Sequence, residues 1–295
     1  MKTQTDWPKK PVYWIEGRTL YASVPFTWNL FDVENKLRQT SFEWDKAIVG
    51  GPAIELIPDM FSNLSHVTIG HYCAGILQRI NPLATRTTLG CIRQCPFCAV
   101  PKLEGKFREL DDWPDLPIIC DNNLLAASDR HFNRVIGRLQ GHRDVTFSFG
   151  LDARLLTNPR AKQIASIKSI KKRGIRIALD NQSYSDQWLR ALDMLRDAGI
   201  AKRNIASFAL VGFDTGPVEA WDRCYWIEDC GVRALPNWFH PLDAFKRNIV
   251  TRNQEALGWT DYERRKIMQW FYQHKEAKQY PNAESHWHPN PWKGD

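Results

Sequence analysis

The sequence predicts an α/β fold: a partial, TIM-like (β/α)6 barrel with a small β-rich module before it and a helical extension after it. Two observations carry this prediction. From residue 85 onward, short runs of apolar residues alternate with stretches whose apolar residues recur at helical spacing. Five of the apolar runs are followed directly by acids, amides, Arg or His. In α/β barrels the carboxyl ends of the strands are where ligands bind.

We expect three parts, spanning residues 1–80, 81–242 and 243–295. In the first part, residues 12–24 have the pattern of a hairpin that turns at Glu16-Gly17. Residues 31–37 form a short helix candidate, and the apolar strand at 46–52 ends in Gly-Gly-Pro, a strand-to-loop signal. We interpret this part as a reduced accessory module without a cofactor of its own.

The middle part supplies the six predicted βα units. The predicted strands are 85–89, 116–121, 145–150, 175–180, 205–212 and 232–239. The helices between them are predicted at 126–139, 161–172, 187–198 and 217–230. Gly174 and Gly199 are placed to end two of these helices.

The last part contains a predicted helix at 262–275, in which Ile267, Trp270 and Phe271 share one face. We expect this face to dock on the barrel as a wall of the active-site region. The following His286-Trp287-His288 segment is interpreted as a proline-rich surface tail, with metal binding or base stacking as the alternative.

Composition points to an ordinary soluble globular protein, with 43% hydrophobic and 25% charged residues. We expect a cytoplasmic protein without a membrane partner, because no run of 18 apolar residues and no apolar signal core is present. Most of the formal charge of +7 lies in residues 76–242, which hold 24 basic and 18 acidic side chains. This excess favours an anionic substrate or nucleic acid as partner, although a solvated basic surface explains it equally well.

The densest group of reactive side chains is Cys91, Cys95 and Cys98, spaced C-x-x-x-C-x-x-C on a loop that starts at Gly90. Three thiolates so close in sequence can converge on one soft metal centre. A 4Fe–4S cluster held by three cysteines keeps one iron without a protein ligand. The alternative is a structural zinc ion with a fourth ligand, but zinc sites usually present two separated cysteine pairs and no second pair follows here. Four other cysteines are interpreted as small buried apolar residues rather than ligands: Cys73, Cys120, Cys224 and Cys230. In the zinc alternative, Cys73 or Cys120 would be the fourth ligand.

The cysteine loop resembles the signature of the radical S-adenosylmethionine superfamily, in which an aromatic residue such as Phe97 precedes the third cysteine. Residues 90–108 are similar to the loop of its methylthiotransferase and cobalamin-dependent branches, and residues 210–219 resemble their fifth-strand segment. The resemblance spans roughly residues 85–240. There is no additional upstream cysteine triplet, no D-x-H-x-x-G cobalamin motif, and no small β-barrel RNA-binding domain after residue 243.

The resemblance implies a 4Fe–4S cluster that reductively cleaves S-adenosylmethionine to a 5′-deoxyadenosyl radical, which abstracts hydrogen from a substrate that is not identified. It also implies an electron donor such as flavodoxin or ferredoxin. Two alternatives stay open. One is a nucleic-acid (tRNA-like) modifying enzyme of the methylthiotransferase type. The other is a non-catalytic zinc or iron–sulfur protein that binds nucleic acid.

The resemblance also implies roles for individual residues. Cys91, Cys95 and Cys98 ligate the cluster, Phe97 packs near the adenine, and Asn122 and Asn123 stand where the methionine amino group binds. Asp180 or Asn181 faces the ribose, and Gly212 and Phe213 lie along the adenine. The end of the third strand adds Asp152 and Arg154 as candidate cofactor-binding residues. The candidates for a second hydrogen donor or proton shuttle are Cys224, Cys230, Asp152 and His240, and the sequence does not choose among them.

Overall fold

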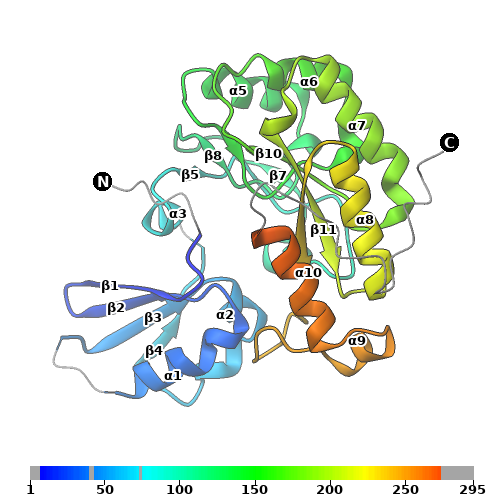
Figure 1. Ribbon diagram of the computed structural model, residues 1–295. Coiled ribbons are helices and arrows are strands. Elements are labelled where there is room, and N and C mark those ends of the chain that lie inside the picture. Colours follow the sequence, from blue (N-terminus) through cyan, green and yellow to red (C-terminus); the bar gives the residue numbers. More distant parts are fainter. Residues whose placement is uncertain (1–6, 40–42, 73–74, 274–295) are drawn as a thin grey trace.

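The computed structural model describes residues 7–39, 43–72 and 75–273. Within these residues the chain packs around two main apolar cores, one in an N-terminal unit and one in a larger body (Figure 1). The N-terminal unit is a four-stranded sheet in the order β1-β2-β3-β4, with β1 and β2 antiparallel and the other pairs parallel. Its strands are β1 (Val12–Glu16), β2 (Thr19–Ser23), β3 (Lys46–Gly50) and β4 (Val67–Ile69). The helices of the unit are α1 (Leu30–Arg38) and α2 (Pro52–Leu56).

The predicted hairpin and short helix of this unit are confirmed. Gly17 has φ +59°, a left-handed conformation that suits glycine at the hairpin turn. Helix α1 buries Leu30, Val33 and Leu37 on one face, because these positions recur at helical spacing.

The larger body contains two separate three-stranded parallel sheets, ordered β5-β8-β9 and β10-β11-β12. A further pair, β6 with β7, is antiparallel. The bounds of the first group are β5 (Ala84–Thr85), β6 (Thr88–Leu89), β7 (Arg108–Glu109), β8 (Ile118–Ile119) and β9 (Thr146–Phe147). The second group is β10 (Ile175–Ala178), β11 (Ile205–Val211) and β12 (Arg233–Trp238).

The prediction of a partial, TIM-like (β/α)6 barrel is therefore wrong. The described residues form a mixed α/β structure of small sheets, and no continuous six-stranded ladder runs through them. One cause lies at the predicted first strand, where the backbone N–H groups of Thr87 and Thr88 bond to the Asp121 carboxylate instead of a strand. A second lies at Gly150, whose φ of +98° turns the chain out of the extended conformation after β9. The two sheets meet there only through isolated links: the Phe147 N–H donates to the Gly174 carbonyl over 2.7 Å, and Leu151 forms a bridge with Ile177.

Helices cover the sheets of the larger body on their outer side (Figure 1). Apolar faces at helical spacing pack on the strands, as in the α5 residues Phe132, Val135 and Ile136, all buried in the main core. The helices of the larger body are α3 (Ile76–Ile80), α4 (Val100–Leu103), α5 (Asp129–Leu139), α6 (Asn158–Ala165), α7 (Ser185–Asp197), α8 (Pro217–Asp229), α9 (Arg252–Ala256) and α10 (Asp261–Gln273).

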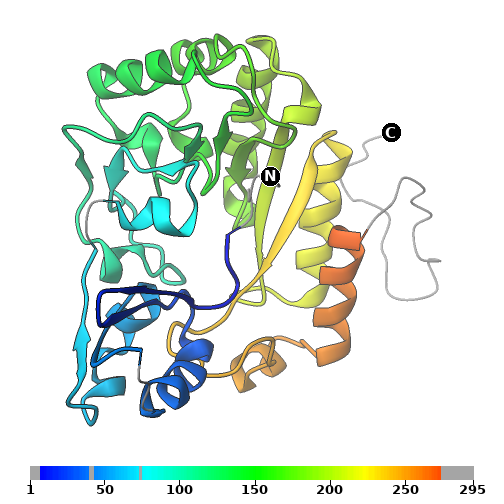
Figure 2. The ribbon, with the colours of Figure 1, turned by 90° about the vertical axis from the view of Figure 1, so that its left-hand side faces the viewer.

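Helix α10 confirms the predicted docking face. Ile267 and Phe271 are fully buried in the main core, and Trp270 packs against it. The helix lies against β12, the edge strand of its sheet, and against α8, so it shields the edge of the sheet. Figure 2 shows it on the opposite side of the body from the cyan segment around residues 85–110. The helix is therefore not a wall of the cysteine loop, and that part of the prediction is wrong. The His286-Trp287-His288 tail lies outside the described residues.

The N-terminal unit contacts the larger body beside the carboxyl end of β12 and beside the cysteine loop. The Thr27 hydroxyl donates to the Ala244 carbonyl over 2.6 Å, and the rings of Trp28 and His240 lie 4.7 Å apart. Helix α2 contacts α4, the helix that follows the cysteines. In the described part of the chain, no helix is both long and apolar enough to cross a membrane.

Candidate functional site

The three cysteines lie on the loop between β6 and α4. All three are free thiols and partly exposed. Burial raises the pKa of Cys98, and the negative charges of Cys95 and Cys91 raise it further. The three thiols are therefore close enough to influence one another. Among the residues that the structure describes, no three His, Cys, Asp or Glu side chains lie close enough together to form a single-ion site.

Glu104 closes this loop at its base. Its carboxylate accepts hydrogen bonds from the Gly90 N–H and from the Asn122 side-chain amide, both over 2.8 Å, and pairs with Arg86. Gly90 has φ +73°, and a Cβ built on it would lie 2.4 Å from the Lys106 carbonyl oxygen. Only glycine fits this approach of two backbone segments. Asn122, predicted to bind the methionine amino group, therefore has its amide nitrogen engaged in holding the loop.

Asp121, at the end of β8, fixes the segment before the loop. Its carboxylate accepts from the Thr87 N–H over 2.6 Å and from the Thr88 N–H over 3.1 Å. Burial raises its pKa, while these hydrogen bonds act in the opposite direction. The side chain before it, Cys120, is fully buried in a small core with Ala84 and Ile118. Cys120 is thus a packing residue, as predicted, whereas Cys73 lies outside the described residues.

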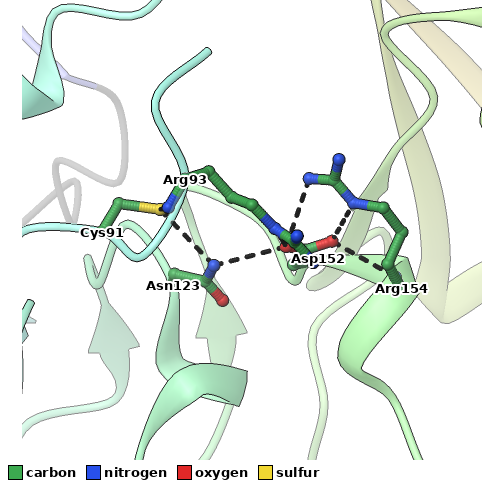
Figure 3. A network of polar contacts seen from close by, with 5 residues as sticks. All are labelled: Cys91, Arg93, Asn123, Asp152 and Arg154. Atoms are coloured by element: carbon green, nitrogen blue, oxygen red, sulfur yellow. Dashed lines mark hydrogen bonds and ion pairs between the residues drawn. The ribbon is translucent and has the colours of Figure 1, made fainter.

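Asn123 links the cysteine loop to the end of the third predicted strand (Figure 3). Its side-chain amide donates to the Cys91 sulfur over 3.4 Å and to an Asp152 oxygen over 3.3 Å. The Cys91 sulfur also accepts from the Arg93 backbone N–H over 3.3 Å. Two donors are thus directed at one sulfur, as the supporting hydrogen bonds around a metal site are directed at its ligands.

The carbonyl oxygen of Asn123 is the unsatisfied atom of this network. The side chain is 1% exposed, and its Oδ1 has no hydrogen-bond partner in the structure. The Cys91 sulfur and the Asp152 carboxylate both accept hydrogen bonds, so the NH2 group of the Asn123 amide must face them. These two neighbours therefore determine which end of the amide is the oxygen. A buried acceptor without a partner costs free energy. The carbonyl oxygen of Asn123 is therefore an unused hydrogen-bond acceptor within this network.

Asp152 is the centre of the network (Figure 3). Its side chain is 8% exposed and accepts from Arg93 Nε over 2.9 Å and from Arg154 Nε over 2.7 Å. Burial acts to raise the pKa of Asp152, but the hydrogen bonds and charges of the two arginines lower it below its usual value. Arg154 also lies over the Tyr184 ring at 4.7 Å, and its positive charge counteracts the rise in the pKa of Cys95 that burial causes. Asp152 is thus an ionised anchor between two cations, rather than a free proton shuttle.

Asp180 stands at the carboxyl end of β10. Burial raises its pKa to about 6, although the charges of Arg223 and Arg154 and a hydrogen bond from the Leu210 backbone oppose the rise. Asn181, the other predicted ribose contact, donates to Asp214 over 3.0 Å and accepts from the Ser183 N–H over 2.9 Å. Asn181 therefore shapes the turn, and Asp180 is the stronger candidate of the two.

Phe97 and Phe213, both predicted from the resemblance to lie at the adenine, are in contact. Their ring centroids lie 5.4 Å apart, and Phe213 meets Phe239 at 4.9 Å. Gly212 has φ +78°, and a Cβ there would lie 2.5 Å from the Trp238 ring. Its role is to turn the chain after β11 so that Phe213 meets Phe97.

The predicted hydrogen donors separate into two groups. Cys224 is fully buried, and burial raises its pKa to about 12. Cys230 ends α8 and so lies toward the amino ends of the strands, away from the cysteine loop. The ring of His240 accepts from the Asn248 N–H over 3.1 Å, and burial lowers its pKa. Of the four candidates, Asp152 and His240 are at the carboxyl ends of strands.

Sequence reasoning missed Arg86, Arg93, Glu104 and Arg223. Arg93 had a signal, because it is the only charged residue between the first and third cysteines. Glu104 and Arg86 are paired across 18 positions, a separation that no periodic pattern marks. No protein-family model matches the chain, and no curated protein matches it.

Proposed function

We propose that this chain is a radical S-adenosylmethionine enzyme that holds a 4Fe–4S cluster through Cys91, Cys95 and Cys98. The observation that carries the proposal is the cysteine loop: three partly exposed thiols lie on it, and the Asn123 amide, whose own oxygen has no partner, donates to the Cys91 sulfur. Such an acceptor matches the amino group of S-adenosylmethionine. The cluster, when bound, supplies the electron for reductive cleavage of the sulfonium.

The residues around the loop have the donor chemistry that this cofactor pair requires. Three partly exposed thiols on one loop fit a cluster, and the Arg93 and Asn123 hydrogen bonds to the Cys91 sulfur would orient it as a ligand. Arg154 places a positive charge near Cys95, where it stabilises a thiolate or the carboxylate of S-adenosylmethionine.

The nucleoside end of S-adenosylmethionine is assigned to the neighbouring strand ends. The Asp180 carboxyl group is the hydrogen-bonding partner for the ribose hydroxyls, and the faces of Phe97 and Phe213 pack on the adenine. The rings also exclude water from the space between the loop and β11, which protects a reactive radical. The electron is delivered by a small redox protein such as flavodoxin or ferredoxin.

Iron and acid-labile sulfide analysis of protein purified without oxygen tests the proposal. We expect about four irons and four sulfides per chain, a brown colour, and their loss in Cys91→Ala, Cys95→Ala and Cys98→Ala. Cys230→Ala is the matched control, because this thiol is also partly exposed but lies outside the loop. It should keep the full iron content. A colourless protein with one tightly held zinc ion would instead identify a structural metal site and refute the proposal.

A further inference from the structure

An exposed aromatic surface lies where the N-terminal unit meets the loop after β12. We call Phe26, Trp28, Phe31 and Phe245 the aromatic patch. Phe26 and Trp28 stack with their ring centroids 4.4 Å apart and their planes 10° apart, and Phe31 meets Phe245 at 5.0 Å. Phe31 is 51% exposed, and Phe26 and Phe245 are also exposed. Large aromatic side chains gathered at a surface usually mark a binding site.

The patch is connected to the candidate site through the end of β12. Phe97 of the cysteine loop meets Phe213, and Phe213 meets Phe239. The next residue in the chain is His240, and its ring centroid lies 4.7 Å from that of Trp28. The two groups of rings are therefore joined through consecutive residues of the chain, Phe239 and His240. The Phe26–Trp28 stack presents an exposed ring, on which another flat ring can stack.

Positive charge borders the patch on the Phe245 side, whereas the acid Asp32 follows Phe31 on α1. The loop at 240–252 carries Lys246, Arg247 and Arg252 and only one acid, Asp243. Lys246 and Arg247 follow Phe245 directly and are exposed. Aromatic rings for stacking combined with cations for phosphates are the requirements for binding a single-stranded nucleic acid.

We infer that the aromatic patch binds single-stranded nucleic acid next to the candidate site around the cysteine loop. This inference names the substrate class of the proposed enzyme and rests on that proposal. The bases stack on Phe26 and on the Phe31–Phe245 pair, and Lys246 and Arg247 contact the backbone. A duplex keeps its bases stacked internally, so it should bind through phosphates alone and more weakly.

Binding is measured by fluorescence anisotropy with labelled U12, dT12 and a 12-base-pair duplex, using the full chain. The measurement needs no S-adenosylmethionine and no reductant, so its failure is distinct from failure of the proposed chemistry. We expect single strands to bind more tightly than the duplex. Phe26→Ala combined with Phe245→Ala should weaken single-strand binding by about ten-fold. The control, Tyr262→Ala, removes a ring that is 64% exposed but lies on α10, and should bind normally.

A second measurement separates stacking on the rings from attraction to the phosphates. Replacing both Lys246 and Arg247 with Ala should flatten the dependence of log K on log salt by about 1.4, or about 0.7 for each phosphate that is no longer neutralised. The double Phe variant should keep the original slope. Equal binding of single strand and duplex, or a double Phe variant indistinguishable from Tyr262→Ala, would overturn the inference. Absence of binding at low salt would overturn it as well and direct attention to a protein partner.

Discussion

Replacing Asp152 with Asn tests whether this carboxylate holds the cysteine loop against the end of the third predicted strand. Asp152 accepts from Arg93, Arg154 and Asn123 and is nearly buried. The substitution keeps the shape of the side chain but removes the charge that compensates two guanidinium groups. Removing one partner of a fully buried ion pair costs about 3–5 kcal/mol. The two arginine side chains remain about a quarter to a third exposed, so solvent screens part of the loss and we expect about 1–3 kcal/mol.

The free energy of unfolding is measured by urea denaturation at pH 7 and at lower pH. Because the arginines lower the pKa of Asp152, its contribution is complete above the unfolded pKa near 4 and is lost as the pH falls through the folded value. The difference between wild type and variant should therefore shrink on acidification. Asp112→Asn is the matched control, since Asp112 also pairs with two arginines but has a side chain that is 78% exposed. Equal stability losses for the two variants, or a difference that grows toward low pH, would refute the reasoning.

Three other substitutions test the base of the cysteine loop, the end of β10 and the packing of α10. Glu104→Gln removes the charge paired with Arg86 and weakens the base of the cysteine loop, so iron content per chain should fall and unfolding stability should drop by about 2–4 kcal/mol. Asp180→Asn should raise the free energy of unfolding by about 1–3 kcal/mol at pH 8 and leave it unchanged at pH 4. The reason is that Asp180 has a pKa of about 6 in the folded protein, so the wild type loses stability as the pH rises through that value. Ile267→Ala removes a fully buried side chain where α10 packs on the core, and we expect a loss of about 2–4 kcal/mol in urea denaturation with unchanged iron content.

The order of strands and helices along the chain could be predicted, because apolar periodicity is local. The arrangement of the strands into sheets could not. Predicted strand 85–89 has the composition of one strand, yet Asp121 from a distant segment captures the Thr87 and Thr88 amides and breaks it into two. Such long-range capture leaves no mark in the composition of the strand. The barrel prediction failed for this reason and because Gly150 turns the chain out of the extended conformation after β9.

The candidate site was predictable where its residues carry a spaced motif. The sequence marked Phe97, Phe213, Asn123 and the cysteines as candidates, and the structure brings Phe97 into contact with Phe213 and Asn123 into contact with Cys91. Asn122 and Asn181 differ, because their amides are engaged by Glu104 and by Asp214. An Asn after a strand has the same sequence signal whether it binds a ligand or supports a loop, so only the three-dimensional contacts separate the two roles.

The central claim is tested most directly by electron paramagnetic resonance of the dithionite-reduced, iron-loaded protein before and after addition of S-adenosylmethionine. We predict a reduced 4Fe–4S signal that changes on addition, accompanied by 5′-deoxyadenosine in the reaction mixture. Asn123→Leu, which removes the unpartnered oxygen, should bind S-adenosylmethionine at least several-fold more weakly while keeping its iron. A fully loaded cluster whose signal does not respond to S-adenosylmethionine, with no 5′-deoxyadenosine formed, would contradict the claim.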